Sequence, residues 1–203
     1  MPKQSIRSKQ LRQQIADYAA KLIYESGIRD YQLAKQKAAN ALGFSDVKCL
    51  PTNQELEAAL FAHINLFDSA DQSEKLIQLR EIAIKAMQYL QQFNPKLVGS
   101  VLSGTASKHD SVVLHLFCDI TEQVGLYLND TGVPFEEKQR RVRLSQNEYI
   151  QRPMVKFIAD ATPIELILFS QDDIRQSPLS PINGLPMERA SLKKLKKMLG
   201  MDE

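Results

Sequence analysis

The spacing of apolar residues changes near Pro95, and this change constrains the fold more than any other feature of the chain. Before Pro95, apolar residues such as Leu11, Ile15 and Leu22 recur at the three- and four-residue steps of amphipathic helices. After it, the run Val112–Phe117 alternates with the period of two that is typical of a strand. Helices followed by strands predict an α+β fold, in which an N-terminal helical region precedes a mixed β-sheet with flanking helices.

Local end signals divide the helical region. Gly27 and Gly43 are expected to end the first two helices, because glycine adopts the left-handed conformation that ends a helix without a steric penalty. Thr52 and Glu55 form a capping box, which predicts the start of a third helix at this point.

A fourth helix is expected across residues 76–90, ending before Asn94-Pro95 because the residue before proline disfavours the helical conformation. The polar residues 68–73 separate this helix from the third. We therefore expect an N-terminal helical region at residues 1–70 and an α+β domain at residues 71–203.

The second part of the chain contains five candidate strands. These are residues 97–102, 112–117, 135–144, 149–158 and 164–169. The last is apolar enough to be central in the sheet, whereas Pro153 indicates an edge or bulged strand. We expect a helix over residues 119–129, with Asp119 and Glu122 as a cap, and a terminal helix over residues 191–199.

The net charge of +2, from 26 basic and 24 acidic residues, is too even to predict nucleic-acid binding by itself. Basic residues nevertheless gather in three clusters, at Lys3, Arg7, Lys9 and Arg12, at Lys138, Arg140, Arg141 and Arg143, and at Lys193, Lys194, Lys196 and Lys197. Such clusters could bind phosphates or simply be solvated. No aromatic residue is interleaved with them in a stacking pattern.

The cysteines and the apolar segments indicate the cellular compartment in which the protein is expected. Cys49 and Cys118 lie far apart in unlike contexts, which favours free thiols in a reducing compartment. The N-terminal residues show no apolar signal segment, and no run approaches the roughly 18 apolar residues of a membrane helix. We therefore expect a cytoplasmic protein that has no membrane partner.

The segments Leu97–Ser100, Gly104–Ala106 and Ser111–Phe117 carry the strongest motif. They resemble the core motif of the nucleotidyltransferase superfamily, in which a strand ends in Gly-Ser and the next strand begins with two acidic residues separated by one apolar residue. Residues i and i+2 of a strand point to the same side, so two such carboxylates can hold Mg²⁺ beside a nucleoside triphosphate. The resemblance implies a third carboxylate on a later strand, where Glu165 lies.

A wider resemblance covers nearly the whole chain. Through Leu50–Asn53, Leu114–Phe117 and Arg175–Met187, the chain is similar to a group of proteobacterial proteins described as nucleotidyltransferase-like and of unknown function. This similarity implies a nucleotidyltransferase-like domain but no particular activity.

The acidic pair of the motif is missing. Its two positions fall on Ser111 and Val113, neither of which can hold a metal ion as a carboxylate would. Asp110 is one residue out of register and points to the other face, unless the strand begins only at Ser111 and leaves Asp110 in the loop. Glu165 is then the one well-placed acid, so no resident metal is expected, and Mg²⁺ would be required only if the site is active.

The remaining candidate ligand-binding residues are a histidine and two arginines. His115 shares a strand face with Ser111, so it could pair with Glu165, or it could be hydrogen-bonded to another neighbour. Arg175 and Arg189 flank a proline-containing loop, where they could hold an acidic ligand or fasten the loop to the sheet.

Three hypotheses follow. The first is a nucleotidyltransferase-like protein that binds a nucleotide or phosphorylated ligand without catalysis, the second an interaction or RNA-binding protein that uses the fold as a scaffold, and the third an active nucleotidyltransferase that uses Asp110 and Glu165. The predicted ligand-binding residues are Gly99, Ser100, Gly104, Thr105, Ser111, His115, Glu165 and Arg175.

Overall fold

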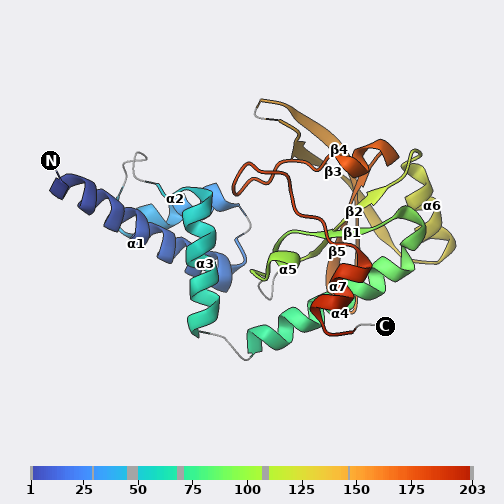
Figure 1. The fold of residues 1–203 in the computed structure, drawn as a ribbon, viewed down its shortest axis with the longest axis horizontal. Helices are drawn as coiled ribbons and strands as arrows, with labels where there is room; N and C mark the ends of the chain where they lie inside the picture. The colour runs from blue at the N-terminus through green and yellow to red at the C-terminus, as the bar shows by residue number, and fades with distance from the viewer. Residues whose placement is uncertain are drawn as a thin grey trace. The chain divides into compact units, whose positions relative to one another are not determined.

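The structure, a computed structural model, describes residues 2–28, 30–44, 50–67, 71–106, 110–145 and 147–201. It has the predicted α+β fold, with helices in the N-terminal part and a five-stranded mixed sheet after them (Figure 1). The chain divides into two compact units, one formed by Met1–Ser73 and the other by Glu74–Ala106 and Asp110–Glu203.

The first unit contains α1 (Pro2–Ser26), α2 (Tyr31–Ala41) and α3 (Asn53–Phe67). Gly27 follows α1 with a φ of 66°, and its N–H donates to the carbonyl of Ile23, as expected for a glycine stop. The predicted capping box is confirmed, because the Glu55 N–H donates to Thr52 Oγ1 (3.1 Å) and the Thr52 N–H donates to Glu55 Oε2 (2.7 Å). These local contacts fix where two of the three helices begin or end.

The core of the first unit is built mainly from small residues. It consists of Ile15, Ala16, Ala19, Ala20, Ile23, Ala34, Ala38, Ala39, Leu56, Ala59, Leu60 and Ile64. Lys35 is also buried, and its ammonium donates to the Pro51 carbonyl (2.9 Å) and to Asn53 Oδ1 (2.7 Å). Burial lowers the pKa of Lys35, while nearby Glu55 acts in the opposite direction. These two bonds fasten α2 to the start of α3.

The second unit contains the sheet. Its helices are α4 (Asp71–Tyr89, which begins just before the unit boundary), η2 (Gln91–Phe93), α5 (Ser100–Ser103), α6 (Glu122–Asp130), η3 (Gln171–Arg175) and α7 (Leu192–Met198). Its strands are β1 (Lys96–Val98), β2 (Val112–Phe117), β3 (Phe135–Arg143), β4 (Tyr149–Ala159) and β5 (Thr162–Phe169). The spatial order is β1-β2-β5-β4-β3, in which β2 and β5 are parallel and the other neighbours are antiparallel. Of the helices in the described ranges, none combines the length and apolar character needed to cross a membrane.

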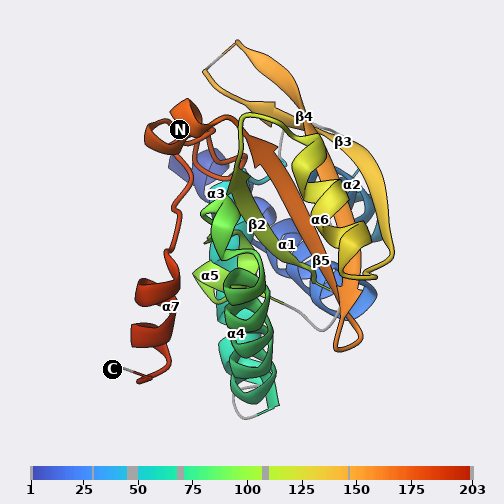
Figure 2. The ribbon, with the colours of Figure 1, turned by 90° about the vertical axis from the view of Figure 1, so that its right-hand side faces the viewer.

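The two faces of the sheet are covered differently. Helices α4 and α6 lie over one face (Figure 2), where Leu114, Leu166 and Met87 belong to the larger core cluster. On the opposite face a smaller cluster contains Phe117, Val142, Met154, Ile167 and Phe169, and Ile174 of η3 packs against it. The alternation along β2 and β5 therefore divides their side chains between two cores.

Three predicted elements need correction. The candidate strand 97–102 ends at Val98, and the residues from Ser100 onward form the single turn of α5 instead. The fourth helix ends at Tyr89, five residues before Asn94, and continues as η2. Helix α6 begins at Glu122 without a side-chain cap, because the Asp119 carboxylate accepts the N–H of Gln171 (3.2 Å) rather than capping the helix.

Pro153 lies in the part of β4 that is paired with β3 but not with β5. Strand β4 is not an edge strand, because it lies between β5 and β3. However, its pairing with β5 begins at Met154, one residue after Pro153. Pro153 therefore has β3 on one side and no strand partner on the other, which explains why the missing N–H is tolerated. The prediction that β5 is central is confirmed.

Candidate functional site

The predicted cleft residues come together at one end of the sheet. Because β1 is antiparallel to β2, the carboxyl end of β1 at Val98 lies opposite Val113, near the amino end of β2. Because β2 and β5 are parallel, Glu165 also lies opposite Val113. The loop after β1 and the first residues of β2 and β5 therefore share this end of the sheet.

The loop after β1 depends on two glycines with positive φ. Gly99 has φ 76° and ψ −156°, a region that is accessible essentially to glycine alone, although a Cβ there would meet no atom within 4 Å. Its backbone conformation, rather than a lack of space, therefore requires glycine. Gly104 ends α5 with φ 89° and donates its N–H to the carbonyl of Ser100 (2.9 Å). Beside it, the hydroxyls of Ser103 and buried Thr105 share a hydrogen bond of 2.9 Å.

Arg80 brings a cation to this loop that sequence reasoning missed. From α4, its Nε donates to the Val101 carbonyl (3.2 Å) and its Nη2 to the Leu102 carbonyl (3.3 Å). The same Nη2 would lie 3.9 Å from a Cβ added to Gly104. Burial lowers the pKa of Arg80, but a guanidinium remains charged at neutral pH.

A serine and a glutamate form a buried pair at this end of the sheet. The Ser111 hydroxyl donates to Glu165 Oε1 at 3.0 Å, and the two residues are only 4% and 7% exposed. Asp110 is half-buried and lies in the loop before β2, which begins at Val112. This agrees with the alternative in which the strand begins after Asp110. Across the described ranges, no three His, Cys, Asp or Glu side chains are grouped so that they could hold a metal ion.

Of the two alternatives for His115, the structure supports the hydrogen bond to another neighbour and not the pair with Glu165. His115 is fully buried, and its Nδ1 accepts the Nε–H of Arg189 at 3.1 Å. Its Nε2 has no hydrogen-bond partner in the part of the chain that the structure describes. Burial, followed by the charge of Arg189, lowers the pKa of His115 to about 3, so the imidazole is neutral at physiological pH. His115 is therefore part of the interior and not a base for Glu165.

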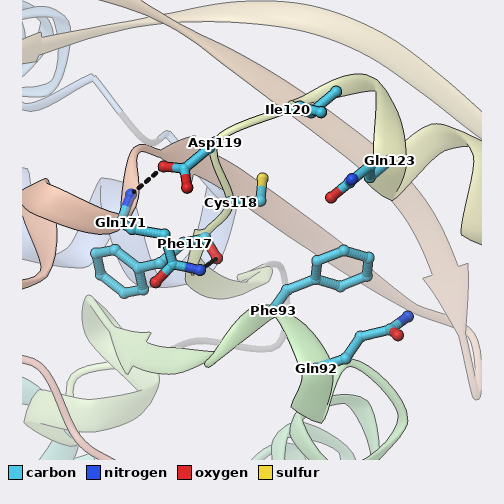
Figure 3. Close-up of a pocket in the computed structure, with 8 residues that line it drawn as sticks. All are labelled: Gln92, Phe93, Phe117, Cys118, Asp119, Ile120, Gln123 and Gln171. Carbon is cyan, nitrogen blue, oxygen red and sulfur yellow. Dashed lines mark hydrogen bonds between the residues drawn. The ribbon is translucent and has the colours of Figure 1, made fainter.

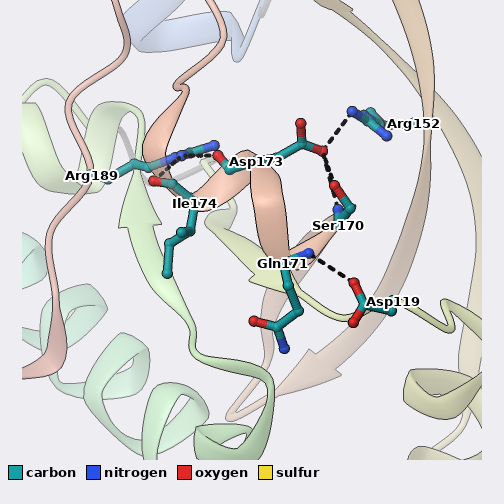
Figure 4. Close-up of polar contacts among 7 residues, drawn as sticks. All are labelled: Asp119, Arg152, Ser170, Gln171, Asp173, Ile174 and Arg189. Carbon is teal, nitrogen blue, oxygen red and sulfur yellow. Dashed lines mark hydrogen bonds and ion pairs between the residues drawn. The ribbon is translucent and has the colours of Figure 1, made fainter.

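Arg189 fastens the proline-containing loop to the sheet, while Arg175 lies exposed on η3. The Nη1 of Arg189 donates to the carbonyls of Asp173 (2.9 Å) and Ile174 (3.2 Å) (Figure 4). Its guanidinium carbon lies 4.8 Å from the ring centroid of Phe117. This supports the alternative in which an arginine ties down the loop. Because η3 follows the carboxyl end of β5, Arg175 is at the opposite end of the strand from the cleft residues.

A cavity of about 300 Å³ also lies at the carboxyl ends of β2 and β5 (Figure 3). Its lining residues are Gln92, Phe93, Phe117, Cys118, Asp119, Ile120, Gln123 and Gln171. Burial raises the pKa of the Cys118 thiol, and the charges of Asp119 and Glu122 raise it further. With no basic residue in its lining, this cavity does not suit a phosphate group. This cavity and the loop after β1 lie at opposite ends of β2, a strand of six residues that rises about 3.3 Å per residue.

Comparison with known proteins adds no assignment. No protein-family model matches the chain, and no curated protein matches it either. The function must therefore be argued from the geometry of these sites.

Proposed function

We propose that this chain is a nucleotidyltransferase-like protein that binds a nucleotide or another phosphorylated ligand at the amino ends of β2 and β5, without catalysing nucleotidyl transfer. The observation that carries the proposal is the hydrogen bond between Ser111 and Glu165. It places a serine beside the later-strand acid at a position where the resemblance implies a carboxylate. This pairing supports a site that lacks the acidic pair of the motif.

The loop after β1 supplies groups that suit a phosphate. Arg80 places a guanidinium beside Gly104, and the hydroxyls of Ser103 and Thr105 lie next to it. A guanidinium and hydroxyls can bind phosphate oxygens directly, without a metal ion between them.

A thermal-shift series tests the proposal. The full chain is melted with each of the four ribonucleoside triphosphates at millimolar concentration, once in Mg²⁺ and once in EDTA. At least one triphosphate is expected to raise the melting temperature in EDTA, because ligand that binds the folded state stabilises it. The variant Arg80→Met should lose this ligand-induced shift. Arg175→Met, which removes the same charge at the other end of the strand, should keep the shift.

Two outcomes distinguish the alternatives. A shift that requires Mg²⁺ and disappears in both Asp110→Asn and Glu165→Gln would favour an active nucleotidyltransferase. The absence of a shift with any triphosphate would contradict nucleotide binding. The remaining alternative, an interaction or RNA-binding protein, is favoured by a separate observation on the β3–β4 hairpin.

A further inference from the structure

The hairpin of β3 and β4 extends beyond the sheet. Residues 149–153 of β4 pair with residues 139–143 of β3, from Gln139 opposite Pro153 to Arg143 opposite Tyr149. The pairing of β4 with β5 begins only after this stretch. These ten residues therefore form a two-stranded ribbon that projects past the other strands (Figure 2). A ribbon of this kind presents its side chains outside the core of the domain.

The ribbon concentrates positive charge. Its ten residues include Arg140, Arg141, Arg143 and Arg152, and none of them is acidic. Arg152 is paired with Asp173 at 2.7 Å, whereas Arg140 and Arg141 form no ion pair within the described residues. The chain as a whole carries only +2. The ribbon is thus a local basic site on a nearly neutral protein.

An aromatic ring lies among these arginines. Tyr149 is 48% exposed, and the guanidinium carbon of Arg141 lies 4.1 Å from its ring centroid. The corresponding distance for Arg143 is 5.9 Å. The basic cluster of β3 has no aromatic residue interleaved in its own sequence, because Tyr149 belongs to the neighbouring strand β4. Antiparallel pairing supplies the ring that the linear pattern lacked.

Alternate residues bring these groups to one face of the ribbon. Gln139, Arg141, Arg143, Tyr149 and Gln151 point to the same side, and we refer to them as the ribbon face. Four of the five are exposed, and Arg143 is half-buried. The opposite side of the ribbon contributes to the smaller core through Val142. The ribbon face is the side that remains open to a partner.

We propose that the ribbon face binds single-stranded nucleic acid. Its arginines would contact phosphates, while Tyr149 with Arg141 would form a platform for a stacked base. The amides of Gln139 and Gln151 can meet base edges. A nucleic-acid duplex keeps its base faces stacked, and an anionic membrane or an acidic peptide has no base to place on the ring. The exposed aromatic ring is therefore what favours a single strand.

Fluorescence anisotropy with a labelled 12-nucleotide uridine oligomer tests this proposal across 50–200 mM salt. With the two arginines of the ribbon face on phosphates and a slope of about −0.7 for each, the logarithm of the binding constant should fall with log salt at a slope of about −1.4. Tyr149→Ala should weaken binding about tenfold, while Tyr149→Phe should retain it. The double variant Arg141→Ala/Arg143→Ala should weaken binding and reduce the slope by about 1.4.

The matched control removes two positive charges elsewhere. Lys193 and Lys197 are both exposed on α7, so Lys193→Ala/Lys197→Ala changes the net charge equally and should leave affinity nearly unchanged. An equal loss in both double variants would overturn the proposal, as would unchanged binding by Tyr149→Ala. Tighter binding to a duplex of the same length, or to phosphatidylserine vesicles, would overturn it too. Melting curves of each variant check that the fold is intact.

Discussion

At the scale of single residues, the bond between Ser111 and Glu165 is the most informative contact of the candidate site. Removing the hydroxyl in Ser111→Ala takes one donor from a buried carboxylate. We expect the free energy of unfolding to fall by about 1–3 kcal/mol, the usual cost of removing one partner from a buried polar pair. Urea denaturation of the full chain measures this change.

A double-mutant cycle separates the bond from other effects of the substitution. If the bond accounts for the loss, Ser111→Ala should cost much less in a Glu165→Leu background, where residue 165 has no acceptor. Ser145→Ala, at an exposed serine, should change stability by no more than about 0.5 kcal/mol. Equal losses from Ser111→Ala in both backgrounds would show that the two side chains are not coupled.

His115 should make the protein sensitive to acid. Its pKa in the folded state is about 3, against 6.5 for an unperturbed histidine, so between these values the unfolded chain binds one more proton. The histidine therefore has no effect on stability above pH 6.5. Below it, His115 should lower the free energy of unfolding by about 1.4 kcal/mol per pH unit down to about pH 3.

The variant His115→Asn isolates this contribution. Its amide oxygen can still accept the Nε–H of Arg189, but the side chain does not titrate. Denaturation between pH 7 and pH 4 should give a shallower fall in stability for this variant than for the parent chain. Parallel curves for the parent and His115→Asn would refute this assignment.

At the scale of elements, the helices and strands that were predicted well are those set by residues close to one another in the sequence. The capping box at Thr52 and Glu55 and the glycine stop at Gly27 both form as the sequence indicates. Each depends on residues within three or four positions of one another, so the signal does not require knowledge of the tertiary fold. The interior position of β5 was predicted for a similar reason, since all of residues 164–169 except Glu165 are apolar.

The elements that sequence reasoning missed depend on distant contacts or are very short. Helix α5 is a single turn, too short for periodicity to distinguish from the end of β1, and its Val101 and Leu102 are buried as strand residues would be. Asp119 resembled a helix cap, but Gln171, 52 residues away, takes its carboxylate. In both cases tertiary structure overrode a plausible local pattern.

The candidate site was predictable only in part for the same reason. The positions of Ser111 and Glu165 followed from the motif and the period of the strands, and the structure places them in contact. By contrast, Arg80 reaches its loop from α4, and Arg189 reaches His115 across 74 residues. Contacts between side chains on distant elements produce no recognisable spacing pattern in the sequence. Neither contact could therefore be inferred.

At the scale of the whole molecule, each of the two units has a core of its own. The larger unit, with a chain of about 130 residues, is long enough to bury roughly two-thirds of its unfolded surface. The core of the helical unit has seven alanines among its twelve buried residues. Because alanine buries little apolar area, the hydrophobic contribution to the stability of this unit is smaller.

This difference predicts two calorimetric transitions for the full chain, the lower belonging to the helical unit. A fragment of residues 71–203, which begins where α4 begins, should retain the upper transition and lose the lower one. Leu56→Ala should lower the melting temperature of the first transition alone, and Leu166→Ala that of the second, since each residue is buried in one core. A single transition that both substitutions shift equally would instead mean that the two cores unfold as one cooperative system.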